Sequence, residues 1–496
     1  MMSLKRTIAY ASDGRRELTC LALFFFVFLS GMYMFDERMS LFAGPAQVVA
    51  FEALLLGASV AGFVLRPVLL YRTRRVFQIV PGIMSVLAAV ALVVVLMAQR
   101  LEVALVGGSV GFCALGYTGS AAHAFVSRRY ARSAYLARTV ALSYAGGVLL
   151  QFVCHTLLPS GIPQQFALVV GAIAMVVMLR VGNGPDSDGR GASRGPGADR
   201  GTVVRLVLAT CCLTVVFAAL NAACTMEHAS GSIDLGGWSR LVLVASAIAA
   251  GHLFDMRRRG AMSLVMLCVA MLSTLSFFLV VVGGSVLAAT LLFYVGSGFF
   301  SVFFTTAFMA LAPSTRHPEL WPSMGRIINC TCSMVVAGPA AALAGGGDVL
   351  AAAVAMMLVC VGMAIALRKP FEVLEVPEGQ PEPAPGSSAG AFSVGGESSA
   401  ERPSDESVRS DGDTSESAQE AFGEKLTAFG AAYGFSEREV AIMRALLTSE
   451  GSVKSVADAL YLSRSTLYRH ISSMNKKTGT TSRMALITAF WSWEGR

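Results

Sequence analysis

Charged residues are scarce in this sequence. Asp, Glu, Lys and Arg make up 14% of the 496 residues, whereas hydrophobic residues make up 54%. A soluble protein carries about a quarter charged residues, because water must solvate its surface. The shortage excludes an ordinary soluble protein and indicates that a lipid bilayer surrounds most of the chain. The formal net charge of +7 does not by itself indicate nucleic acid, because cytoplasmic membrane loops also carry arginine.

The spacing typical of metal sites and redox motifs is missing. None of the ten cysteines has C-x-x-C spacing, and several lie in or beside apolar runs: Cys113, Cys211, Cys212, Cys330 and Cys360. We expect small apolar side chains packed between helices, with no metal site and no cofactor. The sequence also has no nucleophile elbow, phosphate-cradling glycine loop or paired carboxylates, so we do not expect an enzyme.

Apolar runs long enough to cross a membrane recur along the first three quarters of the chain. A helix needs about 20 residues to cross a hydrocarbon core of roughly 30 Å. We find about twelve such runs. Each alone would also suit a buried core helix, but so many in succession predict an all-α bundle of transmembrane helices. The first run, Leu18 to Tyr33, lacks a cleavage site and is interpreted as a retained span. The runs are centred near Phe25, Leu55, Ala89, Gly111, Gly147, Gly171, Leu213, Ala245, Ala270, Tyr294, Val335 and Met357.

Basic residues alternate between the connecting segments, as the positive-inside rule requires. The segments with isolated basic residues contain Arg38, Arg100 and Arg240. The alternation predicts an even number of spans in the cytoplasmic membrane, with the N- and C-termini in the cytoplasm. The basic clusters assigned to the cytoplasmic side are Arg66/Arg72/Arg74/Arg75, Arg128/Arg129/Arg132, Arg190/Arg194/Arg200, Arg257/Arg258/Arg259, Arg316/Arg326 and Arg368/Lys369.

Two polar segments divide the chain. A Gly/Pro-rich linker at 181–203 separates a first six-helix membrane half at 1–180 from a second half at 204–369. An acidic segment rich in Pro, Gly and Ser follows at 370–420, and its composition predicts a disordered linker. Such a coil has an r.m.s. span on the order of 40 Å. A domain at 421–496 would therefore reach DNA near the membrane.

One short motif in the membrane region carries a family resemblance. Gly251 to Arg259 reads GHLFDMRRR, which resembles the G-x-L-x-D-R-x-G-R-R loop of major facilitator transporters. The corresponding first-half stretch, Gly62 to Arg75, keeps the arginines but has no aspartate. The resemblance rests on this loop and on the six-plus-six layout. It implies a similar fold, whereas transport does not follow from it.

The residues from Phe422 onward return to a helical pattern with interspersed basic residues. Ser436 and Glu439 have the S-x-x-E spacing of a capping box, which predicts a helix start. Two short segments, Val453 to Leu460 and Arg464 to about Lys477, are separated by a tight turn. This spacing predicts a helix-turn-helix at about 453–472 within a small four-helix domain. The predicted inner side consists of Ala457, Leu462, Leu467 and Ile471, and the outer side of Arg464, Ser465, Tyr468, Arg469 and Ser472.

The same residues resemble the LuxR-type DNA-binding domain. FSEREVAIMRALL and VKSVADALYLSRSTLYRHISSMNKKTGTTSRMALI follow that family's pattern over about one seventh of the chain. Three positions depart from it: Ala441 replaces a glutamate, Tyr468 a lysine and Thr478 a leucine. Because Tyr468 replaces a cation that contacts DNA, the family's base preference does not transfer. Arg469 is the candidate to supply that charge.

The resemblance implies roles for individual residues. Lys454, Thr466 and Lys477 would hold phosphates, while Ser465, Tyr468 and Arg469 would face the major groove of double-stranded DNA. The last helix would pair with its copy in a homodimer, and RNA polymerase is a further possible partner. A small protein-interaction domain with a solvated basic face is the alternative. The full predicted DNA-binding set is Lys454, Ser463, Arg464, Ser465, Thr466, Tyr468, Arg469, Lys476 and Lys477.

Polar and ionisable residues inside the spans are the candidates for a ligand site, because burying such groups in a bilayer is unfavourable. Four stand out: Glu52, Tyr117, His123 and Asn221. Each also suits a hydrogen bond between helices or an interfacial position. The sequence thus predicts a membrane-bound transcription regulator whose transporter-like domain senses an unknown small molecule. The alternative is a transporter with an appended regulatory domain, and the few intramembrane carboxylates favour the receptor.

Overall fold

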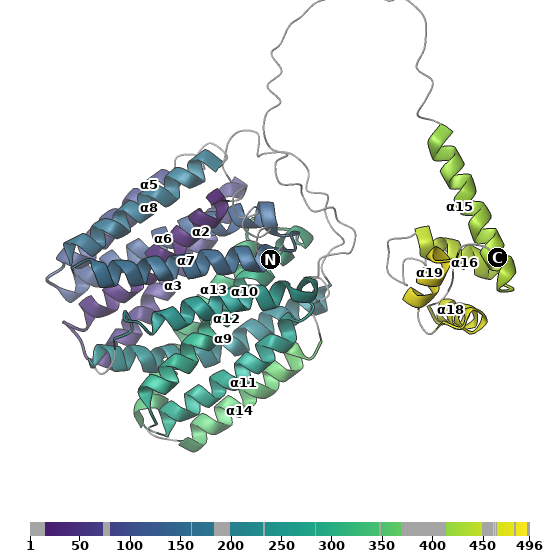
Figure 1. The fold of residues 1–496 in the computed structure, drawn as a ribbon. Helices are drawn as coiled ribbons and strands as arrows, with labels where there is room; N and C mark the ends of the chain where they lie inside the picture. Colours follow the sequence, from purple (N-terminus) through teal and green to yellow (C-terminus); the bar gives the residue numbers. More distant parts are fainter. Residues whose placement is uncertain are drawn as a thin grey trace, which may run out of the picture. The chain divides into compact units, whose positions relative to one another are not determined.

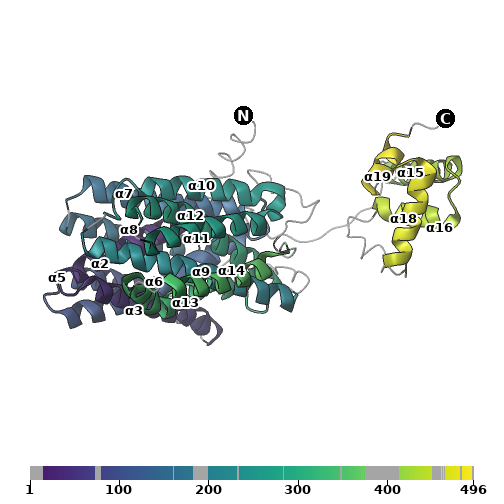
Figure 2. The ribbon, with the colours of Figure 1, turned by 90° about the horizontal axis from the view of Figure 1, so that it is seen from below.

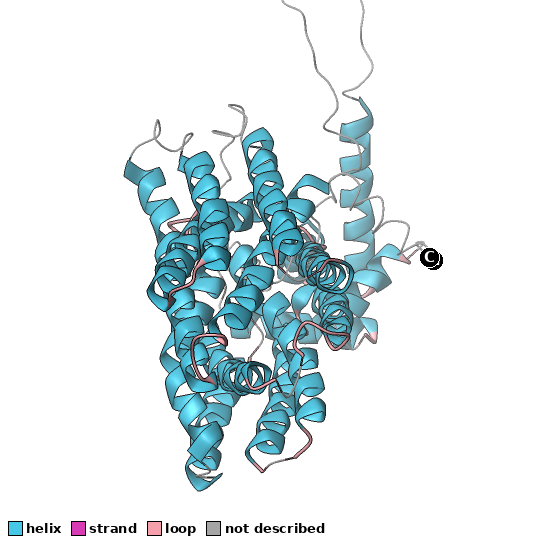
Figure 3. Cartoon of the chain, turned by 90° about the vertical axis from the view of Figure 1, so that its left-hand side faces the viewer, coloured by secondary structure: helices cyan, strands magenta, loops and turns pink. Residues whose placement is uncertain are grey.

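The computed structural model describes residues 15–72, 80–159, 161–182, 199–231, 234–282, 284–346, 349–369, 371, 374, 413–448, 460, 462, 464–480 and 483–493. Within these residues every regular element is a helix (Figure 3). The chain divides into two compact units, Met1–Val376 and Pro377–Arg496. The all-α prediction is therefore confirmed, and each unit is considered by itself.

The first unit contains twelve α-helices among its described residues. The first six are α2 (Arg15–Met39), α3 (Pro45–Arg72), α5 (Val80–Met97), α6 (Leu101–Tyr130), α7 (Leu136–Leu157) and α8 (Ile162–Gly182). The next six are α9 (Arg200–Ala229), α10 (Arg240–Asp255), α11 (Met262–Val281), α12 (Val286–Leu311), α13 (Trp321–Gly346) and α14 (Val349–Leu367). Each contains one of the apolar centres predicted from the sequence. Helices α8 and α9 extend slightly into the predicted central linker.

The two sets of six helices repeat one packing pattern. The first helix of each set packs on the fifth (α2 on α7, α9 on α13), and the second packs on the fourth (α3 on α6, α10 on α12). The halves meet where α7 packs on α10 and α3 packs on α13. In Figures 1 and 2 the first six helices, purple to blue, lie side by side, and the next six, teal to green, adjoin them. The six-plus-six prediction is confirmed by this repeat.

The outer faces of the first unit are apolar. Nine helices in the described part of the chain are long and apolar enough to cross a membrane. Large apolar side chains such as Val86, Val106 and Leu264 are about two-thirds exposed. Exposure of so many apolar side chains to water would be unfavourable, whereas contact with lipid is favourable. The first unit is therefore a multi-pass membrane domain.

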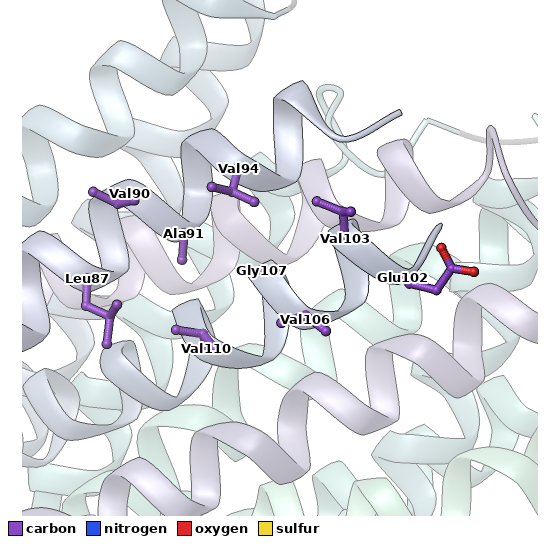
Figure 4. A pocket seen from close by; sticks show the side chains of 9 residues that line it. All are labelled: Leu87, Val90, Ala91, Val94, Glu102, Val103, Val106, Gly107 and Val110. Carbon is purple, nitrogen blue, oxygen red and sulfur yellow. The ribbon is translucent and has the colours of Figure 1, made fainter. Parts of the chain in front are cut away.

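One apolar groove on this unit lies between α5 and α6 (Figure 4). Its volume is about 420 Å³, and Glu102 is the one charged residue among those that line it. Several lining residues, including Val90 and Val106, are themselves exposed. The groove therefore continues the apolar outer surface and contains none of the predicted ligand-binding residues.

Close helix packing depends on glycine where α3 crosses α6. A Cβ atom added to Gly116 would overlap the Ser59 carbonyl oxygen, and one added to Gly62 would overlap the Cys113 carbonyl oxygen. Small residues let membrane helices approach at such short range. The crossing helps to fix α3, which carries Glu52.

The second unit contains α15 (Asp413–Ala432), α16 (Glu437–Thr448), α18 (Arg464–Thr478) and α19 (Arg483–Trp491). Its core consists of Leu426, Phe429, Ile442, Met443, Leu446, Leu467, Ile471, Met474, Leu486 and Phe490. Helix α15 corrects the predicted linker, because 413–420 are helical. This stretch contains Ala, Glu and Gln, which favour helix. It was assigned to the linker because the segment as a whole is acidic. Most of the predicted helix at Val453 to Leu460 lies outside the described residues.

Candidate functional site

Helix α18 presents one apolar face and one polar face. Leu467, Ile471 and Met474 are buried, and their spacing forms a single stripe along the helix. Arg469, Ser472 and Lys476 are exposed on the opposite face. The sequence predicted Leu467 and Ile471 inside and Arg469 and Ser472 outside, and these four placements are confirmed. The basic side chains of α18 can therefore meet an anionic surface without disturbing the core.

A capping box starts α16 and connects it to α18. The Ser436 backbone amide donates to Glu439 Oε2 (2.8 Å), and the Glu439 amide donates to Ser436 Oγ (3.3 Å). This confirms the predicted box. Lys477 Nζ also donates to Glu439 Oε2 (2.7 Å) and to the Gly434 carbonyl oxygen (2.8 Å). Although burial opposes it, these bonds lower the pKa of Glu439 to about 2. The ionised carboxylate thus ties the start of α16 to the end of α18.

The membrane unit contains a central, partly open cavity of about 210 Å³. Helices from both halves line it, among them α2, α3, α9, α12 and α13. Five of its lining residues carry ionisable acidic or basic groups: Asp36, Glu52, His228, Arg240 and Arg326. The remainder are mainly aromatic, aliphatic or neutral polar. This combination of apolar walls with a few polar groups is typical of small-molecule sites.

Two of the predicted ligand-binding residues meet in this cavity. Asn221 Nδ2 donates to Glu52 Oε1 (2.9 Å), and Thr225 Oγ1 donates to Glu52 Oε2 (3.1 Å). Glu52 lies on α3 in the first half, whereas Asn221 and Thr225 lie on α9 in the second. The Glu52 carboxylate therefore forms a hydrogen-bonded link between the two halves, and this link is part of the cavity wall.

The other two predicted ligand-binding residues lie elsewhere. His123 is buried, its Nδ1 is 2.7 Å from the Gly119 carbonyl oxygen, and Phe24, Phe25 and Phe63 surround its ring. Tyr117 is fully buried on the same helix, α6. Neither is among the residues that line the cavity. The structure therefore groups Glu52 with Asn221 and separates both from Tyr117 and His123.

Three charged residues of the cavity were not predicted as ligand-binding residues from the sequence. Arg326 was predicted in a cytoplasmic basic cluster and Arg240 in an outside loop, yet both are buried helical residues that line the cavity. Asp36, the third, was not singled out in the sequence. For Arg326 the sequence holds a usable signal. Pro322 follows Trp321, and proline favours the first turn of a helix, which places Arg326 inside α13.

Ion pairs join the two halves where α3 ends and α13 begins. Glu319 bonds Arg66 (3.1 Å) from α3 and Arg128 (2.9 Å) from α6. Although burial opposes it, the two arginines hold the pKa of Glu319 below its ordinary value. Arg66 was predicted in a loop cluster, but it is a buried residue of α3. Its position is explained by this partner, which compensates the buried charge.

A second connection lies at the same end of the bundle. Asp255, the last residue of α10, accepts hydrogen bonds from the backbone amides of Ala137 (3.1 Å) and Arg138 (2.9 Å). These amides open α7, where a carboxylate is favoured by the unpaired donors of the first turn. Asp255 comes from the second half and α7 from the first. Both connections therefore hold the two halves together on one side.

The comparisons with known proteins separate the two units. Residues 434–490 match the model of the family described as "Bacterial regulatory proteins, luxR family". This segment is a LuxR-type DNA-binding domain. No curated protein matches the chain. Among solved structures, the human organic anion transporter MFSD10 (TETRAN) is 15% identical, with 74% of this chain and 99% of that chain covered and a TM-score of 0.47. The proton:xylose symporter XylE, a major facilitator protein, is 11% identical, with 73% and 98% covered and a TM-score of 0.49.

The predicted DNA-binding residues of the LuxR-type domain fall into three groups. Arg469, Lys476 and Lys477 are exposed on α18, and Thr466 on the same helix is half-buried. For Arg464, Ser465 and Tyr468 the structure describes only the helical backbone. Lys454 and Ser463 lie outside the described residues. Lys477 uses two donors within the domain, which leaves its ammonium group a third for another acceptor.

Proposed function

We propose that the chain is a membrane-bound transcription regulator. Its membrane unit senses a small molecule in the central cavity and controls sequence-specific DNA binding by the C-terminal domain. The observation that carries this proposal is the presence, in one chain, of a LuxR-type domain at 434–490 and a multi-pass bundle with a partly polar cavity. The DNA-binding domain requires a cytoplasmic C-terminus, and the alternation of basic clusters supports that orientation in the cytoplasmic membrane.

The inter-half contacts supply a physical route for signalling. Glu52 bonds α9 in the cavity wall, while Glu319 and Asp255 join the halves at one end. A ligand that binds one arrangement of the halves better than another shifts the population towards it. The arrangement of the halves then determines how the tethered domains are presented to DNA.

Recognition of DNA falls to α18. Arg469 is placed to read base edges together with Ser465 and Tyr468, while Lys454, Thr466, Lys476 and Lys477 hold phosphates. Two domains bound to half-sites about one helical turn apart would supply selectivity. RNA polymerase is the expected downstream partner at a promoter.

The dimer of DNA-bound domains is expected to form through α19. Trp491 on this helix is 58% exposed, an unusual exposure for a large aromatic side chain. We expect Trp491→Ala to lower the affinity for paired half-sites by about tenfold or more, as expected for an aromatic interface anchor, and to leave single half-site binding unchanged. Band-shift titrations on both duplexes measure this. Equal effects on both duplexes would remove α19 from the dimer interface.

A reporter gene tests the sensing function. The reporter is placed behind the selected operator in cells that express either the full chain or residues 377–496. We expect only the full chain to respond to compounds in the medium. A reporter that responds equally with both proteins would contradict control by the membrane unit.

A transporter with an appended regulatory domain is the second candidate. One observation favours this candidate. Both Asp36 and Glu52 line the cavity, so it holds two carboxylates, whereas the sequence indicated few carboxylates within the membrane. Uptake into proteoliposomes of a compound that alters the reporter distinguishes a transporting sensor from a receptor.

A further inference from the structure

Arg326 is a buried cation without an acidic partner among the described residues. It is 7% exposed, and it lines the central cavity. Its Nε and one terminal nitrogen have no hydrogen-bond acceptor in the described part of the chain. Its guanidinium carbon lies 5.0 Å from the ring centre of Phe304, 5.5 Å from that of Phe25 and 5.6 Å from that of Phe28. Three aromatic rings therefore surround the charge.

These rings do not replace a counter-ion. A cation over an aromatic face gains about 2 kcal/mol when desolvated, whereas burial of a charge is unfavourable by several kcal/mol. Asp36 is the cavity carboxylate on the same helix as Phe25 and Phe28, but it lies eight residues beyond Phe28. At 1.5 Å per residue this separates them by about 12 Å along α2, too far for an ion pair. Glu52 is already bonded to Asn221 and Thr225.

We propose that the central cavity binds a small organic anion, whose carboxylate pairs with Arg326 and whose apolar body packs on the surrounding phenylalanines. The guanidinium fork matches a carboxylate with two parallel hydrogen bonds. Further along the cavity wall, Phe217 and Phe300 stack with ring centres 4.6 Å apart. An aromatic ring in the ligand suits this lining.

The size of the cavity limits the ligand. A protein cavity of about 150 Å³ holds benzene, so about 210 Å³ holds one ring with a short acidic side chain. Towards the other end, Asp36 Oδ1 is buried without a partner in the described part of the chain. It can accept a hydrogen bond from a hydroxyl group on the far side of the ligand.

This inference rests on the proposed function, because it specifies the ligand class of the proposed sensor. The test uses the full chain in nanodiscs. The probes are benzoate, phenylacetate and 3-phenylpropanoate, each paired with its neutral amide. Binding is measured by titration calorimetry and by the shift in unfolding temperature. We expect at least one acid to bind tenfold or more tightly than its amide.

Variants identify the residue responsible. Arg326→Met is expected to abolish the preference for the acid and to leave the unfolding temperature of the ligand-free protein unchanged or raised, because a buried unpaired charge is removed. Arg326→Lys is expected to restore part of the preference. The control is Arg100→Ala, which removes an exposed arginine outside the cavity and is expected to bind like the wild type.

Three results would overturn the proposal: equal binding of acid and amide, no binding of any acid, or an acid preference retained in Arg326→Met. Operator binding by the same nanodisc samples separates this inference from the sensing function. If an acid binds through Arg326 but does not change operator affinity, the anion site stands and sensing fails. If the reporter responds to other compounds while no acid binds, sensing stands and the anion site fails.

Discussion

The proposed function assigns contact with DNA to single exposed side chains on α18. Arg469 lies opposite the buried Leu467 and Ile471, so its loss does not disturb the core. We expect Arg469→Ala to weaken binding to the preferred operator by about 1–3 kcal/mol and to relax the base preference at one position. Titrations on the preferred duplex and on duplexes altered at single positions measure both effects. Unchanged affinity would exclude Arg469 from the interface.

The exposed face of α18 was more predictable from sequence than the cavity residues, for a physical reason. The face of α18 follows from helical periodicity, a local property that the sequence displays directly. The cavity depends on which helices meet, and this is a long-range property. Glu52 and Asn221 were identifiable as polar residues in apolar runs. Arg326 was missed, because it lies only five residues after the start of α13, and an arginine so close to a helix end was interpreted as a loop residue.

At the scale of elements, helix starts were the most predictable feature. Ser436 and Glu439 form the box that their spacing predicted, and this box fixes the start of α16. The start of α15 was not predicted, because the composition of the segment indicated a linker as far as residue 420. Composition describes a whole segment, whereas a helix boundary depends on a few residues.

The ionised Glu439 makes the stability of the C-terminal unit depend on pH. Its pKa is about 2 in the folded domain and 4.5 ordinarily, so its stabilisation is complete above 4.5 and is lost as the pH falls towards 2. We expect Glu439→Gln to lower the free energy of unfolding by about 2–3 kcal/mol at pH 7, and by less at pH 3. Urea denaturation of residues 377–496 measures both values.

Glu437→Gln is the matched control for this experiment. Glu437 lies two residues before Glu439 but is exposed. We expect this variant to unfold like the wild type at both pH values. A difference between wild type and Glu439→Gln that stays the same at pH 3 and pH 7 would contradict the assigned role of the charge.

At the scale of the whole molecule, the two membrane halves move relative to each other in the proposed mechanism. Glu319 bonds Arg66 and Arg128 across them, so Glu319→Gln should loosen one end of the bundle. We expect faster backbone hydrogen exchange in 312–320 and in the first turn of α7, with little change elsewhere. Exchange mass spectrometry on the full chain in nanodiscs measures this.

Glu102→Gln is the control for hydrogen exchange, because Glu102 is exposed and is not among the inter-half ion pairs. We expect this variant to leave the hydrogen exchange of 312–320 and of the first turn of α7 unchanged. Equal exchange in Glu319→Gln and the wild type would show that this ion pair does not hold the halves together.

The twelve helices of the membrane unit and their grouping in two sets of six were predictable from the sequence, because the hydrocarbon core sets the length of each apolar run. The contacts between the halves were not predictable. Arg66 and Asp255 were assigned to loops, since charged residues at helix ends resemble loop residues when their partners are unknown. Both are bonded across the halves, Arg66 to Glu319 and Asp255 to the first backbone amides of α7. Glu319 was not among the residues that the sequence singled out.

The central claim is that a chain held in the membrane reads a specific DNA sequence. Its most direct test is selection from a pool of random duplexes by the full chain in nanodiscs, repeated over a range of salt concentrations. We predict an enriched motif with two half-sites and an affinity that falls steeply with salt, because phosphate contacts release counterions. No enriched sequence and no salt dependence would contradict the account and would favour a transporter with a protein-docking domain.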